Sequence, residues 1–256
     1  MTELIAAAAA LWEGALTGGL AVFLRIGAAM AVLPAFGERT LSVRIRLGAA
    51  IALTLLVAPA VPADVAPLSW PALMRLLGTE TVIGLAFGLM LRLLIHALQI
   101  TGTIAAQSTS LAQLFGGAAA EPLPAIGHLL VVSGLALAAM ADLHLRLAAA
   151  LIRTYQLFPV GTALAPGELA ELGIAHVARA FALAFSLAAP FVLAALVYNL
   201  ALGAINRAMP QLMVAFVGAP AITGAGLALL ALTAPLALEV WADALRGTLD
   251  RPFGTP

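Results

Sequence analysis

The most constraining feature of this sequence is a series of apolar runs, about six in number, most of them long enough to cross a bilayer as a helix. A membrane-spanning helix needs about twenty mostly apolar residues. Proline or isolated charges interrupt several of the runs. They extend over Leu4 to Phe36, Leu47 to Val61, Val82 to about Ala106, Ile126 to Ala141, Ala175 to Ile205 and Thr223 to Trp241. The pattern predicts an all-α polytopic integral membrane protein without a separate soluble domain.

Composition supports this class and excludes others. Hydrophobic residues make up 63% of the chain and charged residues 9%, and the mean hydropathy is +1.10, which is far from the composition of soluble domains. The absence of cysteine excludes disulfides, thiolate metal sites and cysteine nucleophiles. Because 12 basic residues balance 12 acidic ones, no basic segment points to nucleic acid. With Glu3 near the start and Arg25 as the first arginine, we expect mature chain rather than a signal peptide.

No residue pattern supports an enzyme, a metal site or a cofactor site. His96, His128, His144 and His176 are isolated from one another, and no HExxH pattern occurs. The sequence also lacks a Gly-x-Ser-x-Gly nucleophile elbow and a nucleotide-binding P-loop. Asp142 and Arg146 are four residues apart, the spacing of a local ion pair on a helix.

Charged residues within the apolar runs favour packing against protein. Glu13, Arg25 and Arg92 lie inside predicted spans. Intramembrane ionisable residues usually face a protein interface or an aqueous cavity. We therefore expect these helices to pack in a larger protein assembly.

An uncharged polar stripe follows the third apolar run. Gln99, Thr103, Ser110 and Gln113 are spaced by four, seven and three residues, which brings them near one face of a helix. Such a stripe suits the wall of a wet passage or hydrogen bonding between helices, and the sequence leaves both open.

Two further patterns concern backbone shape. Residues 114 to 124 contain paired glycines and a Pro-x-Pro, so they form either a re-entrant gate buried in protein or an ordinary surface loop. The pairs Gly14/Gly18 and Gly84/Gly88 match the small-xxx-small pattern of close helix approach.

A polar block at residues 206 to 211, Asn-Arg-Ala-Met-Pro-Gln, lies between two apolar runs. An arginine beside a proline in such surroundings marks a tight turn between spans or a functional element.

These residues carry a resemblance to a known family. The stretch from Tyr198 to Leu212, followed by Gly218-Ala219-Pro220, resembles the signature of the FliR family of flagellar export-gate proteins and their virulence type III secretion counterparts. Similar blocks run from Pro34 to Gly48 with Ala58-Pro59, and from Glu80 through Gly84, Gly88 and Gly102 to Glu121-Pro122. The resemblance covers nearly the whole chain in the right order.

The resemblance implies a non-enzymatic core subunit of the bacterial flagellar type III export gate, needed for flagellum assembly and located in the inner membrane. Such subunits pack as helical hairpins in a multi-subunit cone with FliP- and FliQ-type subunits, and work with FlhB- and FlhA-type components. Unfolded exported proteins pass through the cone. The resemblance further implies a FliP-like part at about residues 1–155 and a FliQ-like hairpin at about residues 156–256.

Individual residues receive roles only through this resemblance. The loop from about Ser108 to Pro122 would be the luminal plug, although Glu121-Pro122 stands where the family commonly has Asp-Pro. The predicted plug residues are Ser110, Gln113, Phe115, Gly116, Gly117, Glu121 and Pro122. The predicted assembly residues are Pro34, Arg39, Arg44, Asn206, Arg207, Pro210, Gln211 and Pro220.

Three alternatives remain at this stage. The chain could serve a virulence injectisome instead of a flagellum, because the family includes both. It could be a secondary transporter or channel for a small solute that uses its broken helices as a binding site. An intramembrane enzyme would require a catalytic pair that the sequence does not offer.

Overall fold

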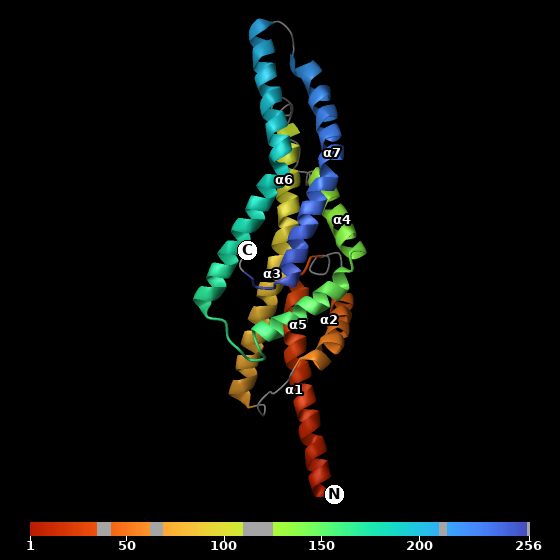
Figure 1. The fold of residues 1–256 in the computed structure, drawn as a ribbon, viewed down its shortest axis with the longest axis vertical. Helices are drawn as coiled ribbons and strands as arrows, with labels where there is room; N and C mark the ends of the chain where they lie inside the picture. The colour runs from red at the N-terminus through yellow and green to blue at the C-terminus, as the bar shows by residue number, and fades with distance from the viewer. Residues whose placement is uncertain (35–41, 62–68, 110–124, 210–213, 255–256) are drawn as a thin grey trace. The chain divides into compact units, whose positions relative to one another are not determined.

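The computed structural model describes residues 1–34, 42–61, 69–109, 125–209 and 214–254, except for the side chains of residues 2–13, 15, 109 and 214–221. The described chain is helical (Figure 1). Its elements are α1 (Thr2–Val32), α2 (Val43–Val57), the 3-10 helix η1 (Ala58–Ala60), α3 (Trp70–Thr109), α4 (Ala125–Met140), α5 (Leu143–Leu157), α6 (Pro166–Ala208) and α7 (Val214–Asp250).

Each of the six predicted apolar runs corresponds to a helix, and the all-α prediction is confirmed. Among the described residues, four helices are long and apolar enough to cross a membrane, or up to five if the bent pair α4 and α5 forms one span. The helices run continuously through Pro190 in α6 and Pro235 in α7. The class predicted from hydropathy is therefore the class observed.

The helix α5 was not among the predicted spans, although the predicted ion pair of Asp142 and Arg146 assumed a helix at its start. It carries arginines on one face, whereas its buried residues recur at helical spacing: Leu147, Ala148, Ala150, Leu151, Thr154 and Tyr155. A hydropathy window averages the two faces and so misses such a helix. A break of two residues separates α4 from α5.

Asp142 makes this break possible. It adopts a left-handed backbone conformation with φ of 58°, which short polar residues tolerate better than most. The predicted ion pair between Asp142 and Arg146 was not the contact found, because Arg146 Nε donates instead to the carbonyl oxygen of Ala141, at 3.2 Å.

The chain divides into two compact units, each assembled from separate stretches of sequence. Unit 1 comprises Met1–Leu93, Ala141–Val177 and Leu245–Pro256. Unit 2 comprises Leu94–Met140 and Ala178–Ala244.

In unit 1, α1 packs against both α2 and the first part of α3. Two glycines of α3 permit the second contact: a Cβ on Gly84 would collide with the backbone carbonyl of Arg25, and one on Gly88 would lie 2.7 Å from the carbonyl oxygen of Ala29. The predicted small-xxx-small contact at Gly84/Gly88 is thus confirmed. For Gly14, by contrast, a Cβ would meet nothing within 4 Å.

In unit 2, α3 and α4 approach closely at a pair of glycines. A Cβ on Gly102 would collide with the backbone of Gly127. Close by in the fold, Trp241 of α7 donates its indole N–H to the carbonyl oxygen of Leu94 of α3, at 2.8 Å. Small residues and one buried indole hydrogen bond therefore fix how these helices pack.

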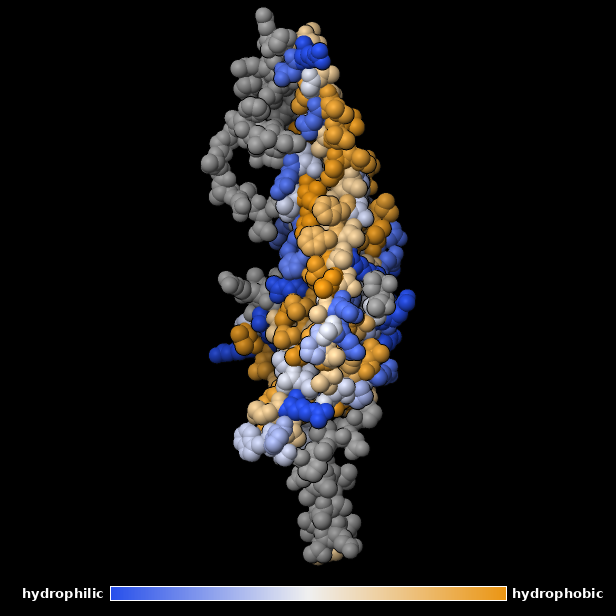
Figure 2. Space-filling view, turned by 90° about the vertical axis from the view of Figure 1, so that its left-hand side faces the viewer, coloured by the Kyte–Doolittle hydropathy of each residue, from blue (hydrophilic) through white to orange (hydrophobic). Residues whose placement is uncertain are grey.

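The part of α6 within unit 2 exposes many large apolar side chains. Apolar residues extend over this helix in the space-filling view (Figure 2). The exposed side chains include Phe181, Phe185, Leu193, Leu196, Val197 and Leu200. A contiguous apolar face on a long helix needs lipid or another protein chain to cover it.

Candidate functional site

The predicted plug residues Ser110, Gln113, Phe115, Gly116, Gly117, Glu121 and Pro122 lie outside the described residues. The structure defines the helices on either side of them: α3 ends at Thr109 and α4 begins at Ala125. Their role as a plug stays a prediction.

The described part of the polar stripe is bonded within its own helix. Thr103 Oγ1 donates to the carbonyl oxygen of Gln99 at 2.9 Å, and Gln99 Oε1 lies 2.8 Å from His96 Nδ1. The hydrogen bond between helices comes from a residue outside the predicted stripe, since Thr101 Oγ1 donates to the carbonyl oxygen of Ala184 of α6 at 3.2 Å.

The predicted assembly residues are distributed along the chain. Pro34 follows the end of α1, Arg44 is exposed in the first turn of α2, and Asn206 and Arg207 are exposed in the last turn of α6. Pro220 lies within the bounds of α7. Arg39, Pro210 and Gln211 lie outside the described residues.

The polar block at residues 206 to 211 lies where one helix ends and the next is about to begin. α6 ends at Ala208 and α7 begins at Val214. Within unit 2 the two helices line one pocket, with Phe191 and Tyr198 from α6 and Ile222 and Leu229 from α7 among its residues. The turn interpretation of the block, one of the two alternatives, fits this helical hairpin.

The most elaborate polar site in the described residues is a buried charge centre in unit 1. Arg25 of α1 and Glu80 of α3 are both fully buried. The Nε of Arg25 donates to Glu80 Oε2 at 2.7 Å. Because the two residues come from different helices, their ion pair ties α1 to α3.

The other donors of Arg25 reach α5 and the residue after it. Nη1 donates to Thr154 Oγ1 at 3.2 Å, and Nη2 donates to the carbonyl oxygen of Phe158 at 2.9 Å. The guanidinium carbon lies 3.6 Å from the centroid of the Tyr155 ring, a cation–π arrangement. One guanidinium thus joins three helices of unit 1.

Glu80 uses its second oxygen to hold the turn after α5. Oε1 accepts a hydrogen bond from the backbone N–H of Gly161 at 2.8 Å. Gly161 has φ of 77°, which glycine adopts at little cost and residues with a Cβ adopt poorly. The charge centre therefore contains Arg25, Glu80, Thr154, Tyr155, Phe158 and Gly161.

The interactions of this centre hold helices together and therefore indicate a structural role. A buried ion pair is tolerated when further hydrogen bonds engage its other donors and acceptors, and both Arg25 and Glu80 make such bonds. Among the described residues, no group of three histidine, aspartate or glutamate side chains is placed to hold a metal ion.

Sequence analysis identified Arg25 as a charge needing protein surroundings but did not find its partner. The partner is 55 residues away, and no local spacing rule connects the two. One signal was present: Glu80 is a lone acid bordering the third apolar run, and a lone acid and a lone base in separate spans are candidates for pairing.

The C-terminal segment of unit 1 packs next to this centre. Phe253 stacks edge-on against Phe158, with ring centroids 5.2 Å apart, and lies 6.4 Å from Phe87. Arg153 bonds to Asp250 Oδ1 and to the carbonyl oxygen of Leu249, each at 3.2 Å. The end of α7 is thereby fastened to α5, although sequence analysis ascribed no structure to it.

These observations define a class: a polytopic helical membrane protein whose buried charges are paired inside while long apolar helix faces remain exposed. Comparison with known proteins narrows the class to a family. A family model described as "Bacterial export proteins, family 1" matches residues 16–248. The chain belongs to this family.

Similar proteins carry one name in different bacteria. Flagellar biosynthetic protein FliR of Caulobacter vibrioides is 36% identical over 235 residues, which cover 90% of this chain and 93% of that protein. FliR of Escherichia coli is 29% identical over 220 residues, covering 83% and 82% of the two chains. FliR of Bacillus subtilis is 28% identical over 207 residues, covering 78% and 80%. The chain is accordingly a membrane component of the flagellar export apparatus.

Proposed function

We propose that this chain is a non-catalytic core subunit of the flagellar type III protein export gate in the bacterial inner membrane. The observation that carries the proposal is the family match over residues 16–248, together with relatives named for flagellar biosynthesis over most of their length. Unfolded proteins on their way to the flagellum would pass through the assembled gate.

The proposed partners are FliP- and FliQ-type subunits, with FlhB- and FlhA-type components and membrane lipid around them. The exposed apolar residues of α6 support a need for such cover, because an isolated chain leaves Phe185, Leu193 and Val197 open. In water, burial of apolar surface is the main driving force for the association of protein subunits. Inside the bilayer, close packing of helices drives it instead.

The division into a FliP-like part at residues 1–155 and a FliQ-like part at residues 156–256 belongs to the same proposal. The hairpin of α6 and α7, whose residues line one pocket in unit 2, supports a FliQ-like second part.

Co-purification tests the proposed assembly. The chain is co-expressed with the FliP- and FliQ-type proteins of the same organism, extracted in mild detergent and purified through a tag on this chain alone. We expect a stable ternary complex. A chain that purifies alone and transports a small solute into liposomes would contradict the proposal and support a secondary transporter.

We further propose that the segment from about Ser108 to Pro122 contains the plug of the gate, although Ser108 and Thr109 belong to the last turn of α3 rather than to a loop. The irregular glycine- and proline-rich composition supports this, because such backbone is tolerated at membrane depth only inside protein or along a cavity. Deleting residues 110–120 should raise the leakage of small ions in cells that express the complete gate. Unchanged leakage with normal gate assembly would contradict the plug.

Arg207 is proposed to act in assembly through the polar block. It is exposed at the end of α6, so its replacement should not disturb the fold of the chain. Arg207→Ala should reduce swimming in soft agar and the yield of the ternary complex. Arg75→Ala, which removes another exposed arginine, is the matched control. Normal motility of the Arg207 variant would make the residue a solvated turn charge.

A further inference from the structure

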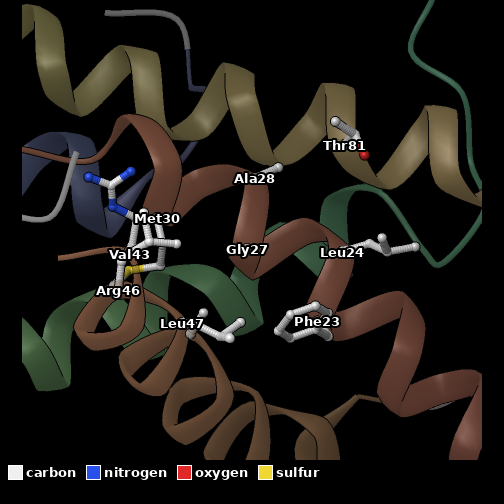
Figure 3. A pocket seen from close by; sticks show the side chains of 10 residues that line it. Phe23, Leu24, Gly27, Ala28, Met30, Val43, Arg46, Leu47 and Thr81 are labelled. Atoms are coloured by element: carbon white, nitrogen blue, oxygen red, sulfur yellow. The ribbon is translucent and has the colours of Figure 1, made fainter.

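A pocket of about 370 Å³ lies in unit 1 between α1 and α2, with one side completed by α3 (Figure 3). Only Arg46 and Thr81 among its lining residues are polar. The lining residues are Phe23, Leu24, Gly27, Ala28, Met30, Val43, Arg46, Leu47, Ala50 and Thr81.

The pocket exists because small residues face it where two helices meet. Gly27 and Ala28 of α1 and Ala50 of α2 contribute little side-chain volume. A Cβ on Gly27 would meet nothing within 4 Å, so the space beside this glycine is open. The pocket is largely open to the surface, so a bound molecule could enter it from the side.

The two ends of the pocket differ in polarity. Met30, Val43 and Arg46 lie together at one end in Figure 3, and Phe23 and Leu24 lie toward the other. The charged end coincides with the first turn of α2, which contains no acidic residue. A helix N-terminus carries partial positive charge, so it adds to the attraction of Arg46 for an anion.

The walls of the pocket suit a hydrocarbon environment. The segment Val43–Ala60 has the hydropathy of a membrane span, and only 17% of it is buried inside the chain. Ile51 and Leu55 of α2 are exposed. The pocket thus opens beside a helix that requires lipid or protein against its outer surface.

We propose that this pocket binds one acyl chain of an anionic phospholipid, with the lipid phosphate held at Arg46. The cationic end and the apolar remainder match the two parts of such a molecule. Arg46 has an interaction within the chain as well, but a guanidinium carries five N–H donors and binds phosphate in a fork. The inference requires only that the chain lie in a bilayer and is independent of its role in export.

The dimensions agree with this occupant. The lining runs from Phe23 to Met30 on α1 and from Val43 to Ala50 on α2. Seven steps along a helix correspond to about 10 Å. One leaflet contributes about 15 Å of the hydrocarbon core, so the pocket would shelter about two-thirds of the depth of one acyl chain.

Photolabelling tests the proposal on the full-length chain in nanodiscs. The probes are phosphatidylglycerol and phosphatidylcholine with the same acyl chains, each carrying a diazirine on one chain. We expect the phosphatidylglycerol probe to label peptides that contain Phe23, Met30 or Leu47 more strongly than the phosphatidylcholine probe. Equal labelling by the two probes would overturn the anionic preference and with it the proposal.

A variant of Gly27, compared with a matched control, tests where on the chain the lipid binds. Gly27→Leu fills the open space and should reduce labelling by about tenfold, since it displaces about two methylene contacts. In the control Gly167→Leu the added side chain also enters open space, but Gly167 of α6 does not line the pocket, so labelling should be unchanged. Wild-type labelling of the Gly27 variant would overturn the proposal.

A second pair of variants tests whether the position of the positive charge at Arg46, and not only its presence on α2, determines the lipid preference. Arg46→Gln should reduce the preference for phosphatidylglycerol by about fivefold. Arg44→Gln removes the same charge from a position about 200° around the helix, and it should change the preference less. An equal loss in both variants would overturn a phosphate held at Arg46.

A photoreactive amino acid in place of Leu47, used in living cells, distinguishes lipid from protein. The proposal predicts a lipid adduct at this position. A cross-link to another protein chain, with no lipid adduct, would overturn it.

Discussion

The two units of the molecule differ in their buried polar residues. Unit 1 encloses a fully buried ion pair, Arg25 and Glu80, and surrounds it with hydrogen bonds from α5 and the turn that follows. In the described part of unit 2 the one buried polar residue is Thr101, and glycine contacts set the helix packing. Both units contain close glycine contacts. Among the described residues, unit 1 adds a buried ion pair with a network of hydrogen bonds, whereas unit 2 has isolated hydrogen bonds between helices, such as that of Trp241.

This difference indicates which parts of each unit need another chain or lipid to cover them. A network of bonds that closes on itself specifies one arrangement of α1, α3 and α5 without help from another chain. The helices of unit 2 expose Phe185, Leu196 and Leu232, and these surfaces need cover. We infer that the arrangement of α1, α3 and α5 is specified within the chain. The exposed faces of unit 2, like that of α2 in unit 1, need lipid or another chain to cover them.

Breaking the ion pair should produce the largest effect. Glu80→Ala leaves the Arg25 guanidinium buried without its carboxylate, and removing one partner of a buried pair costs about 3–5 kcal/mol. We expect a large loss of thermal stability in detergent. Hydrogen exchange should increase first in α1, α5 and the turn at Gly161, all of which lie in unit 1.

Two control variants sharpen this prediction. Glu171→Ala removes an exposed acid and should change stability by less than about 0.5 kcal/mol. The double variant Arg25→Met with Glu80→Leu replaces both charges by apolar groups and should lose less stability than Glu80→Ala alone. Equal losses in the single and the double variant would show that the pair does not act as a unit.

The corresponding test of unit 2 adds one methyl group at a glycine contact. Gly102→Ala places a Cβ against the backbone of Gly127, and α3 and α4 must move apart to admit it. Overpacking of this kind costs about 1–3 kcal/mol. Thermal unfolding measures the loss, and hydrogen exchange should locate it in α3 and α4.

Gly203→Ala is the control for this glycine within the same unit. A Cβ on Gly203 would meet nothing within 4 Å, and alanine favours a helix over glycine by up to about 1 kcal/mol. This variant should therefore be as stable as the wild type or more stable. A Gly102→Ala variant that behaved like it would refute close backbone approach as the basis of packing in unit 2.

The sequence predicted those parts of the fold that depend on local composition. Long apolar runs predicted the helices, and the spacing of Gly84 and Gly88 predicted a close contact that the structure contains. Hydropathy did not delimit α5, whose residues are apolar on one face only. Sequence analysis also missed the partner of Arg25, because a contact over 55 residues leaves no local pattern in a single sequence.

Roles taken from the family resemblance have a different status. Arg44, Asn206 and Arg207 are exposed near helix ends, as residues that contact another chain would be. The buried charge centre was found by geometry and not by motif. Residues that specify the fold of unit 1 and residues proposed for assembly are therefore largely separate sets.

The smallest expected effect concerns the buried hydroxyl of unit 2. Thr101 Oγ1 donates to the carbonyl oxygen of Ala97 in its own helix at 2.8 Å and to that of Ala184 in α6 at 3.2 Å. Thr101→Val keeps the shape and should cost about 0.5–1.5 kcal/mol, the net value of one hydrogen bond. Thr103→Val removes a bond to Gln99 within one helix and should cost less. If thermal unfolding gave Thr101→Val a loss as large as that of Glu80→Ala, a single hydrogen bond would matter as much to unit 2 as the buried ion pair does to unit 1, and the contrast between the units would fail.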